Sequence, residues 1–86
     1  MTYRVIDKPA AERDLEKLPH DVLRRVSDRV SALAEEPRPP GCKKLGGEED
    51  LYRIRVGDYR VLYEINDRER VVRVTRVRHR REVDRR

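Results

Sequence analysis

The residues with the clearest capacity for chemistry are arginines on two short segments that flank a glycine–aspartate pair, Gly57-Asp58. The stretch Asp50–Asn66 reads as two strands joined by a two-residue turn, because glycine accepts the positive φ that such a turn needs. Pairing across this turn places Arg55 directly opposite Arg60, and two facing arginines repel each other unless an anion lies over them. A guanidinium group binds phosphate through two parallel hydrogen bonds. We therefore expect either a phosphate-binding surface or an ordinary solvated face of a half-buried sheet.

The same register divides the hairpin into two faces, since side chains alternate along a strand. The face expected to meet the core carries Tyr52, Ile54, Val56, Tyr59, Val61, Tyr63 and Ile65. The open face carries Arg53, Arg55, Arg60, Leu62 and Glu64. A last strand, Val71–Val77, is expected to pair with the hairpin across a turn at Asn66–Glu69. That register sets Tyr63 against Val72 and Arg60 against Thr75, and it places Arg73 beside Arg60.

Several arginines that converge from neighbouring strands can hold a phosphodiester and stabilise the extra negative charge of its transition state. RNA supplies its own nucleophile, the ribose 2′-hydroxyl, so such a site needs no metal ion. Four further residues with polar, mostly basic side chains follow the last predicted strand, namely Arg78, His79, Arg80 and Arg81. His79 can act as a general acid or base near neutral pH, although a surface histidine in a basic tail is the commoner case.

Length and composition restrict the classes of protein. The 86 residues suffice for one domain, residues 1–86, and the formal net charge of +5 favours a polyanionic partner such as RNA, DNA or an acidic protein. Charged residues make up 45% of the chain, but the apolar residues are periodic, which favours a folded domain except in the charged tail 78–86, a short helix or a disordered segment. Cys42 is the only cysteine, so we expect no intrachain disulfide, no metal and no cofactor. Without an apolar span or a signal peptide, we expect a cytoplasmic protein with no membrane partner.

The order of elements predicts an α+β fold, β-α-α-β-β-β with one further short strand. The predicted elements are a strand at Tyr3–Ile6, helices at Ala10–Leu18 and Asp21–Glu35, an edge segment at Cys42–Leu45, the hairpin and the last strand. Asp7 is a candidate helix cap, and Pro9 suits a first helical turn. The apolar stripes of the two helices are expected to cover one face of a small, mainly antiparallel, twisted sheet and to leave the basic face open.

Two segments together carry a resemblance to a known family. The hairpin sequence Leu51–Tyr63, followed by Val77–Val83 with its His-Arg pair, resembles the RelE group of the RelE/ParE toxin superfamily. The Ala11-x-x-Asp14-Leu15-x-x-Leu18-Pro19 segment and Lys44-Leu45 fit the same pattern, so the resemblance covers nearly the whole chain. It implies a RelE-like fold and a small bacterial or archaeal toxin of a type II toxin–antitoxin pair.

The resemblance also implies an activity and partners. Toxins of the RelE group cut mRNA in the ribosomal A site, where the 2′-hydroxyl attacks the adjacent phosphate and leaves a 2′,3′-cyclic phosphate. An acidic, RelB-like antitoxin encoded beside the toxin covers the basic face, and the complex binds operator DNA through the antitoxin. The catalytic positions fall on Arg53, Arg55, Arg60 and Arg80, to which we add His79. The expected phosphate contacts are Lys43, Lys44, Arg73, Arg78 and Arg81.

The sequence departs from the family pattern near its end. Many RelE-like toxins have a tyrosine after the valine of this motif, where the present chain has Asp84. An ionised carboxylate repels phosphate and cannot stack on a base, and arginine does not release a proton. Asp84 therefore either weakens catalysis or moves proton transfer to His79. Two alternatives stay open: a ParE-like inhibitor that binds DNA gyrase without catalysis, and a nucleic-acid-binding homologue that cuts nothing.

Overall fold

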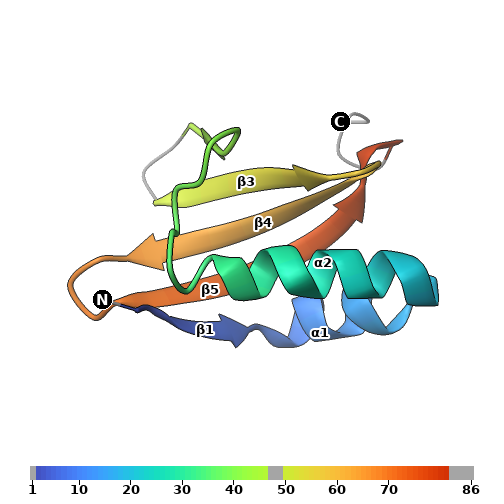
Figure 1. The fold of residues 1–86 in the computed structure, drawn as a ribbon, viewed down its shortest axis with the longest axis horizontal. Coiled ribbons are helices and arrows are strands. Elements are labelled where there is room, and N and C mark those ends of the chain that lie inside the picture. The colour runs from blue at the N-terminus through green and yellow to red at the C-terminus, as the bar shows by residue number, and fades with distance from the viewer. Residues whose placement is uncertain (1, 47–49, 82–86) are drawn as a thin grey trace.

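The chain folds into a mixed five-stranded sheet with two helices packed on it (Figure 1). The computed structural model describes residues 2–46 and 50–81. The elements are β1 (Arg4–Asp7), α1 (Pro9–Glu16), α2 (His20–Ala32), β2 (Lys43–Lys44), β3 (Leu51–Val56), β4 (Tyr59–Asn66) and β5 (Val71–His79). The strand order is β1-β5-β4-β3-β2, in which β1 is parallel to β5 and the other pairs are antiparallel. The predicted α+β class and element order are confirmed, including the short strand β2.

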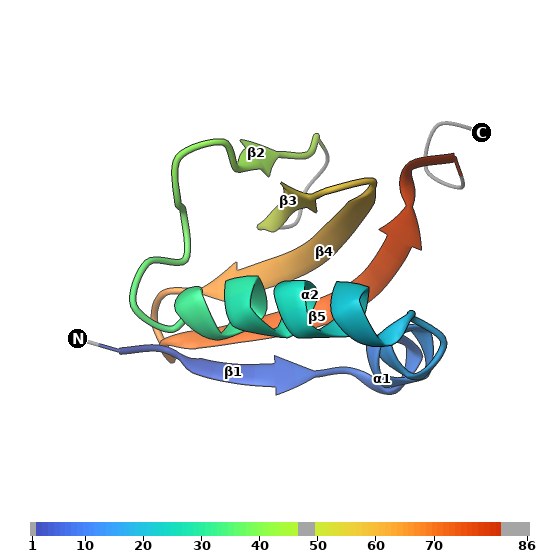
Figure 2. The same cartoon turned by 45° about the vertical axis from the view of Figure 1, so that its right-hand side comes forward.

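Both helices contribute to one hydrophobic core on a single face of the sheet (Figure 2). The stripe of α2 buries Val26, Val30 and Leu33, while α1 buries Ala11. A hydrogen bond of 2.8 Å from the Tyr3 amide to the carbonyl of Ala34 ties the start of the chain to the end of α2. Within the described ranges, no helix is long and apolar enough to cross a bilayer.

The predicted cap of α1 is wrong at one residue. Pro9 opens the helix as expected, but the residue that caps it is Lys8, and Asp7 makes no cap. The reason is that Asp7 still belongs to β1, where it pairs with Val74 of β5. Its backbone is therefore committed to the sheet one residue before the helix begins.

The first hairpin has the predicted register. Arg55 pairs with Arg60, and Tyr52 pairs with Tyr63, across the turn at Gly57-Asp58. Gly57 has φ of 61°, a conformation that side chains other than glycine rarely adopt. The alternation of apolar and basic residues thus fixed both the turn and the faces.

The predicted register of the second hairpin is wrong. Arg60 pairs with Arg78 and not with Thr75, and Tyr63 pairs with Val74 and not with Val72. The turn lies at residues 67–70, one residue later than predicted, where the side chain of Asn66 accepts a hydrogen bond of 2.9 Å from the Glu69 amide. Because of this turn, the half of β5 that follows it pairs with β4 two residues away from the predicted register.

A bulge then shifts the register of the C-terminal half of β5 by one further residue. The register changes between Leu62 and Tyr63, whose partners are Arg76 and Val74, so Thr75 has no partner in the ladder and its hydroxyl bonds the Leu62 carbonyl at 3.1 Å. One extra residue reverses the alternation of faces that follows it. The uneven spacing of the buried valines Val72, Val74 and Val77 was the sequence signal for this bulge.

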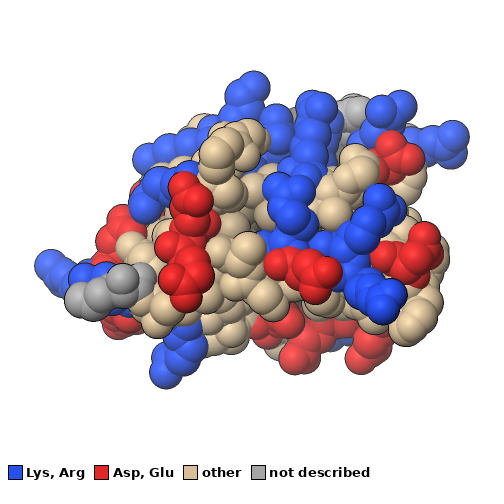
Figure 3. Space-filling view, in the orientation of Figure 1, with Lys and Arg blue, Asp and Glu red and all other residues tan. Residues whose placement is uncertain are grey.

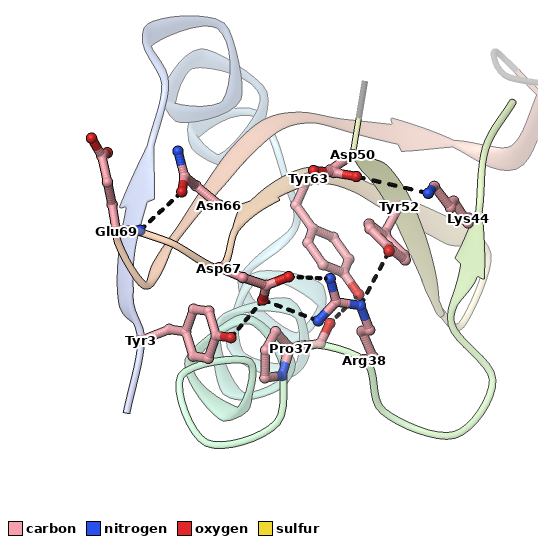
Figure 4. Close-up of polar contacts among 10 residues, drawn as sticks. All are labelled: Tyr3, Pro37, Arg38, Lys44, Asp50, Tyr52, Tyr63, Asn66, Asp67 and Glu69. Atoms are coloured by element: carbon pink, nitrogen blue, oxygen red, sulfur yellow. Dashed lines mark hydrogen bonds and ion pairs between the residues drawn. The ribbon is translucent and has the colours of Figure 1, made fainter. Parts of the chain in front are cut away.

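The proline-rich connection between α2 and β2 is held by side chains (Figure 4). The hydroxyl of the fully buried Tyr63 donates to the carbonyl of Pro37 at 2.8 Å. Arg38 donates to the hydroxyl of Tyr52 at 3.1 Å and to both carboxylate oxygens of Asp67 at 3.2 and 2.9 Å. A segment that the sequence marked only as a loop is therefore anchored to β3, β4 and the β4–β5 turn.

Candidate phosphate-binding site

A hollow of about 340 Å³ lies at the tip of the first hairpin. Its lining consists of Arg55, Gly57, Asp58, Tyr59, Arg60 and Arg80. The amide of Arg80 donates a hydrogen bond of 2.7 Å to the carbonyl of Asp58, which joins the residue after β5 to the hairpin turn. Arginines from β3, from β4 and from just after β5 therefore line one hollow. We name this cavity, with Arg55, Arg60 and Arg80 in its lining, the arginine hollow.

Strand pairing concentrates more positive charge beside this hollow. Arg78 lies opposite Arg60, and Arg53 lies two residues before Arg55 on the same strand face. Partial burial, together with the charges of Arg55 and Arg60, lowers the pKa of Arg53. Mutual repulsion among these groups would be relieved by a bound anion.

His79 is placed on the other side of the sheet. It pairs with Tyr59, and the two rings meet edge to face with centroids 5.1 Å apart. His79 lines a separate hollow of about 240 Å³ with residues of α1, among them Asp14 and Lys17. The structure thus groups three of the five predicted catalytic residues in the arginine hollow. Arg53 lies beside them on the same face of β3, whereas the ring of His79 is not brought to them. Proton transfer by His79 stays a prediction.

The predicted phosphate contacts are spread over the sheet. Lys43 lies opposite Arg53, whereas Lys44 contacts the ring of Tyr52 and lies 3.7 Å from a carboxylate oxygen of Asp50. Arg81 follows Arg80, and its amide donates to His79 Nδ1 at 3.2 Å. Lys43 therefore lies nearer the predicted basic face than Lys44.

Arg73 is not beside Arg60, contrary to the predicted register. It pairs with Glu64 in the sheet, and its guanidinium lies 3.8 Å from the carboxylate of Glu69. The change in register and the bulge place Arg78 opposite Arg60, the position expected for Thr75. The role of Arg73 as a phosphate contact stays a prediction, but the charged residues beside it, Glu64 and Glu69, are acidic.

Carboxylates pair with cations elsewhere in the molecule. The ion pairs are Lys8–Glu64, Arg38–Asp67, Lys44–Asp50, Arg73–Glu69 and Arg76–Asp14. Figure 3 shows Lys and Arg along the upper edge of the molecule, where β3 lies, and down across α2, with Asp and Glu mainly in the lower half and toward the two sides. By contrast, Arg55 makes no ion pair with any carboxylate in the part of the chain that the structure describes.

Two arginines of α2 that the sequence pattern did not single out also reach the hairpin tip. Arg29 donates a hydrogen bond of 3.3 Å to the carbonyl of Arg55. The guanidinium of Arg25 lies so close to Gly57 that a β-carbon there would be 3.6 Å from it. Their spacing of four residues on a helix was the available signal, since it places both on one face.

The chemistry of this arrangement is the binding of negative charge. Within residues 2–46 and 50–81, no group of three His, Cys, Asp or Glu side chains could hold a metal ion. Asp84, on which the strength of catalysis was expected to depend, lies outside the described residues. The arginines can bind and neutralise a phosphodiester, but they cannot exchange protons with it.

Comparisons with known proteins place this geometry in a family. A family model described as "ParE toxin of type II toxin-antitoxin system, parDE" matches residues 5–84. Toxin RelG from Mycobacterium tuberculosis is 39% identical over 87 residues, which cover 100% of both chains.

Solved structures agree with this match. A chain in the crystal structure of the archaeal RelE–RelB complex from Pyrococcus horikoshii has a TM-score of 0.82 and 36% identity, over 93% of this chain and 97% of that one. A chain in the RelBE2 toxin–antitoxin complex from M. tuberculosis has a TM-score of 0.82 and 36% identity, over 92% and 99%. The likeness therefore extends over the whole fold.

Proposed function

This chain belongs to the ParE family of type II toxins, within the RelE/ParE superfamily, and we propose that it is an endoribonuclease that cuts mRNA on the ribosome. The observation that supports this proposal is the arginine hollow, in which Arg55, Arg60 and Arg80 meet from three separate segments. A hollow that only stabilised the fold would gain nothing from three like charges. A scissile phosphate would offset the repulsion among these three charges.

The proposed reaction uses a nucleophile from the substrate. The ribose 2′-oxygen attacks the adjacent phosphorus, the bond from phosphorus to the 5′-oxygen breaks, and the products are a 2′,3′-cyclic phosphate and a 5′-hydroxyl. The arginines of the hollow orient the phosphate and stabilise the added charge on its oxygens in the transition state. The 2′-hydroxyl loses a proton and the 5′-oxygen gains one, and water carries both unless His79 or a residue beyond Arg81 does so.

The proposed partners follow from the same family. The similar structures from P. horikoshii and M. tuberculosis are complexes with antitoxins. We expect an acidic RelB-like antitoxin to cover the basic face of this chain and to connect the complex to operator DNA. The ribosome is the expected site of action, because it presents mRNA in a fixed geometry.

The proposal is tested by inducing the chain alone in a bacterial host and mapping mRNA ends. Wild type should arrest growth and produce new ends within codons, whereas Arg60→Ala and Arg80→Ala should abolish both while the purified variants keep the far-ultraviolet circular dichroism of wild type. Growth arrest without new mRNA ends would contradict the proposal.

Two observations favour a second candidate, an inhibitor of DNA gyrase. The matching family model carries the ParE description, and Asp84 stands where many RelE-like toxins have tyrosine. The named relatives are RelE- and RelG-type toxins, which favours RNA cleavage. A supercoiling assay with purified gyrase separates the two, because inhibition at saturating toxin is expected only for the second.

A further inference from the structure

We propose that Arg25 and Arg29 of α2 extend the arginine hollow into a track that binds the backbone phosphates of mRNA beside the scissile one. This inference rests on the proposed function, because it takes the occupant of the arginine hollow to be an RNA phosphate. It adds a second binding surface on another element of the fold. We name Arg25 and Arg29 the α2 arginines.

The α2 arginines reach the hollow past the open edge of the sheet. β2 pairs with β3 only at Tyr52 and Arg53, so the rest of β3 has no neighbouring strand on that side among the described residues. Arg55 before the turn and Arg60 after it form a pair whose backbone groups point outward from the ladder. Arg29 binds the carbonyl of Arg55 there, at 3.3 Å.

Arg25 lies one helical turn before Arg29 and against the hairpin turn itself. Its Nη2 would be 3.6 Å from a β-carbon at Gly57, and Gly57 lines the arginine hollow. Each of the α2 arginines therefore lies beside a residue that also lines the hollow. A polyanion that leaves the hollow along this edge meets them next.

The α2 arginines have unused binding capacity. Neither makes an ion pair with a carboxylate in the described part of the chain, although five other cations do. The hydrogen bond to Arg55 occupies one of the five donors of Arg29, and both residues are exposed. Covering a strand edge explains one contact, but it does not explain two exposed guanidinium groups held next to three others.

A nucleic-acid backbone fits this surface better than an acidic protein segment does. Phosphates recur at every nucleotide, and a chain of them would continue directly from the hollow to the edge of β3. Arginine forks match phosphate geometry without reading the base, so the track would add affinity and not sequence preference. The alternative partner, an acidic protein, becomes an outcome of the test.

The test measures binding of RNA that cannot be cut. Purified toxin is titrated with a 2′-O-methyl trinucleotide and a 2′-O-methyl nonanucleotide, both of which lack the attacking hydroxyl. In the double variant Arg25→Gln/Arg29→Gln, affinity for the nonanucleotide should fall roughly tenfold, and the slope of log K against log salt should become shallower by about 1.4. Affinity for the trinucleotide should stay within about twofold, because the hollow alone can hold it.

Two further variants control for net charge and for chemistry. Arg13→Gln/Arg24→Gln removes the same charge from two other exposed helix positions, and it should leave both affinities within about twofold. Arg25→Lys/Arg29→Lys keeps the charge and should restore most of the nonanucleotide affinity.

Several results would overturn the inference. These are an unchanged nonanucleotide affinity in Arg25→Gln/Arg29→Gln, an equal loss in the control double variant, or a weakened antitoxin complex with RNA binding intact. Because the RNA is uncleavable, a toxin that binds as expected but cuts nothing would refute the proposed activity and leave the track supported.

Discussion

The two ends of the sheet treat charge in opposite ways. At the end with the β4–β5 turn, Arg38 and Arg73 each pair with a carboxylate, and Lys8 reaches Glu64 on the open face. At the end with the β3–β4 turn, arginines from β3, β4, the end of β5 and α2 converge on one short segment. The ion pairs of the first region hold loops against the sheet, whereas the clustered arginines of the second form a surface that can bind an anionic partner.

The pKa shifts report the same difference. Hydrogen bonds from Arg38 and then Tyr3 lower the pKa of Asp67 to about 2, from an ordinary 3.8. In the other region, the pKa of Arg53 is lowered by partial burial and by the like charges of Arg55 and Arg60. Charges at the β4–β5 turn favour each other's ionised forms, whereas those near the arginine hollow disfavour them.

The largest expected effect separates the two regions by activity. Arg55→Gln should reduce the rate of mRNA cleavage about 100-fold, because it removes a charge that stabilises the transition state. Arg73→Gln removes the same charge from the same sheet, yet it should change the rate by less than about threefold, since Arg73 lies beside Glu64 and Glu69. Cleavage of a defined mRNA on purified ribosomes measures both. Equal losses would mean that total charge matters more than the hollow.

A smaller effect should appear in stability alone. Tyr63→Phe leaves the Pro37 carbonyl without its side-chain donor and should lower the free energy of unfolding by about 1–2 kcal/mol, with cleavage unchanged. Tyr3→Phe is the matched control, because its hydroxyl binds the exposed carboxylate of Asp67, which water can solvate instead. Urea titrations of the three proteins give the comparison. A Tyr3→Phe loss as large as that of Tyr63→Phe would show that burial does not set the cost.

The smallest expected effect is a pH dependence at the β4–β5 turn. Because the folded-state pKa of Asp67 is about 2 and lies below the ordinary 3.8, its ionisation stabilises the fold above that ordinary value, and this contribution is lost as the pH falls toward 2. Asp67→Asn should therefore lose less stability than wild type between pH 5 and about pH 2. Asp28→Asn, an exposed carboxylate on α2, should follow the wild-type curve. Identical curves for wild type and Asp67→Asn would contradict the assignment.

The hairpin shows how far local sequence reaches. Alternation from Leu51 to Asn66 and the glycine at position 57 were enough for the strands, the turn and the Arg55–Arg60 pair, because neighbours across a tight turn are fixed by the turn itself. The register of the last strand was harder to predict from the sequence, since the turn before it is longer. The bulge at Thr75 could be recognised only from the uneven spacing of valines that the core buries.

Sequence by itself therefore determined the α+β class, the order of the elements, the basic face and the family to which these patterns belong. Tertiary structure alone decided which charges meet. It removed Arg73 from the predicted cluster, put Arg78 opposite Arg60, turned His79 toward α1 and brought Arg25 and Arg29 to the hairpin tip. The physical reason is that periodicity fixes the face on which a side chain lies, whereas its neighbours depend on strand register and on how far a helix reaches across a sheet edge.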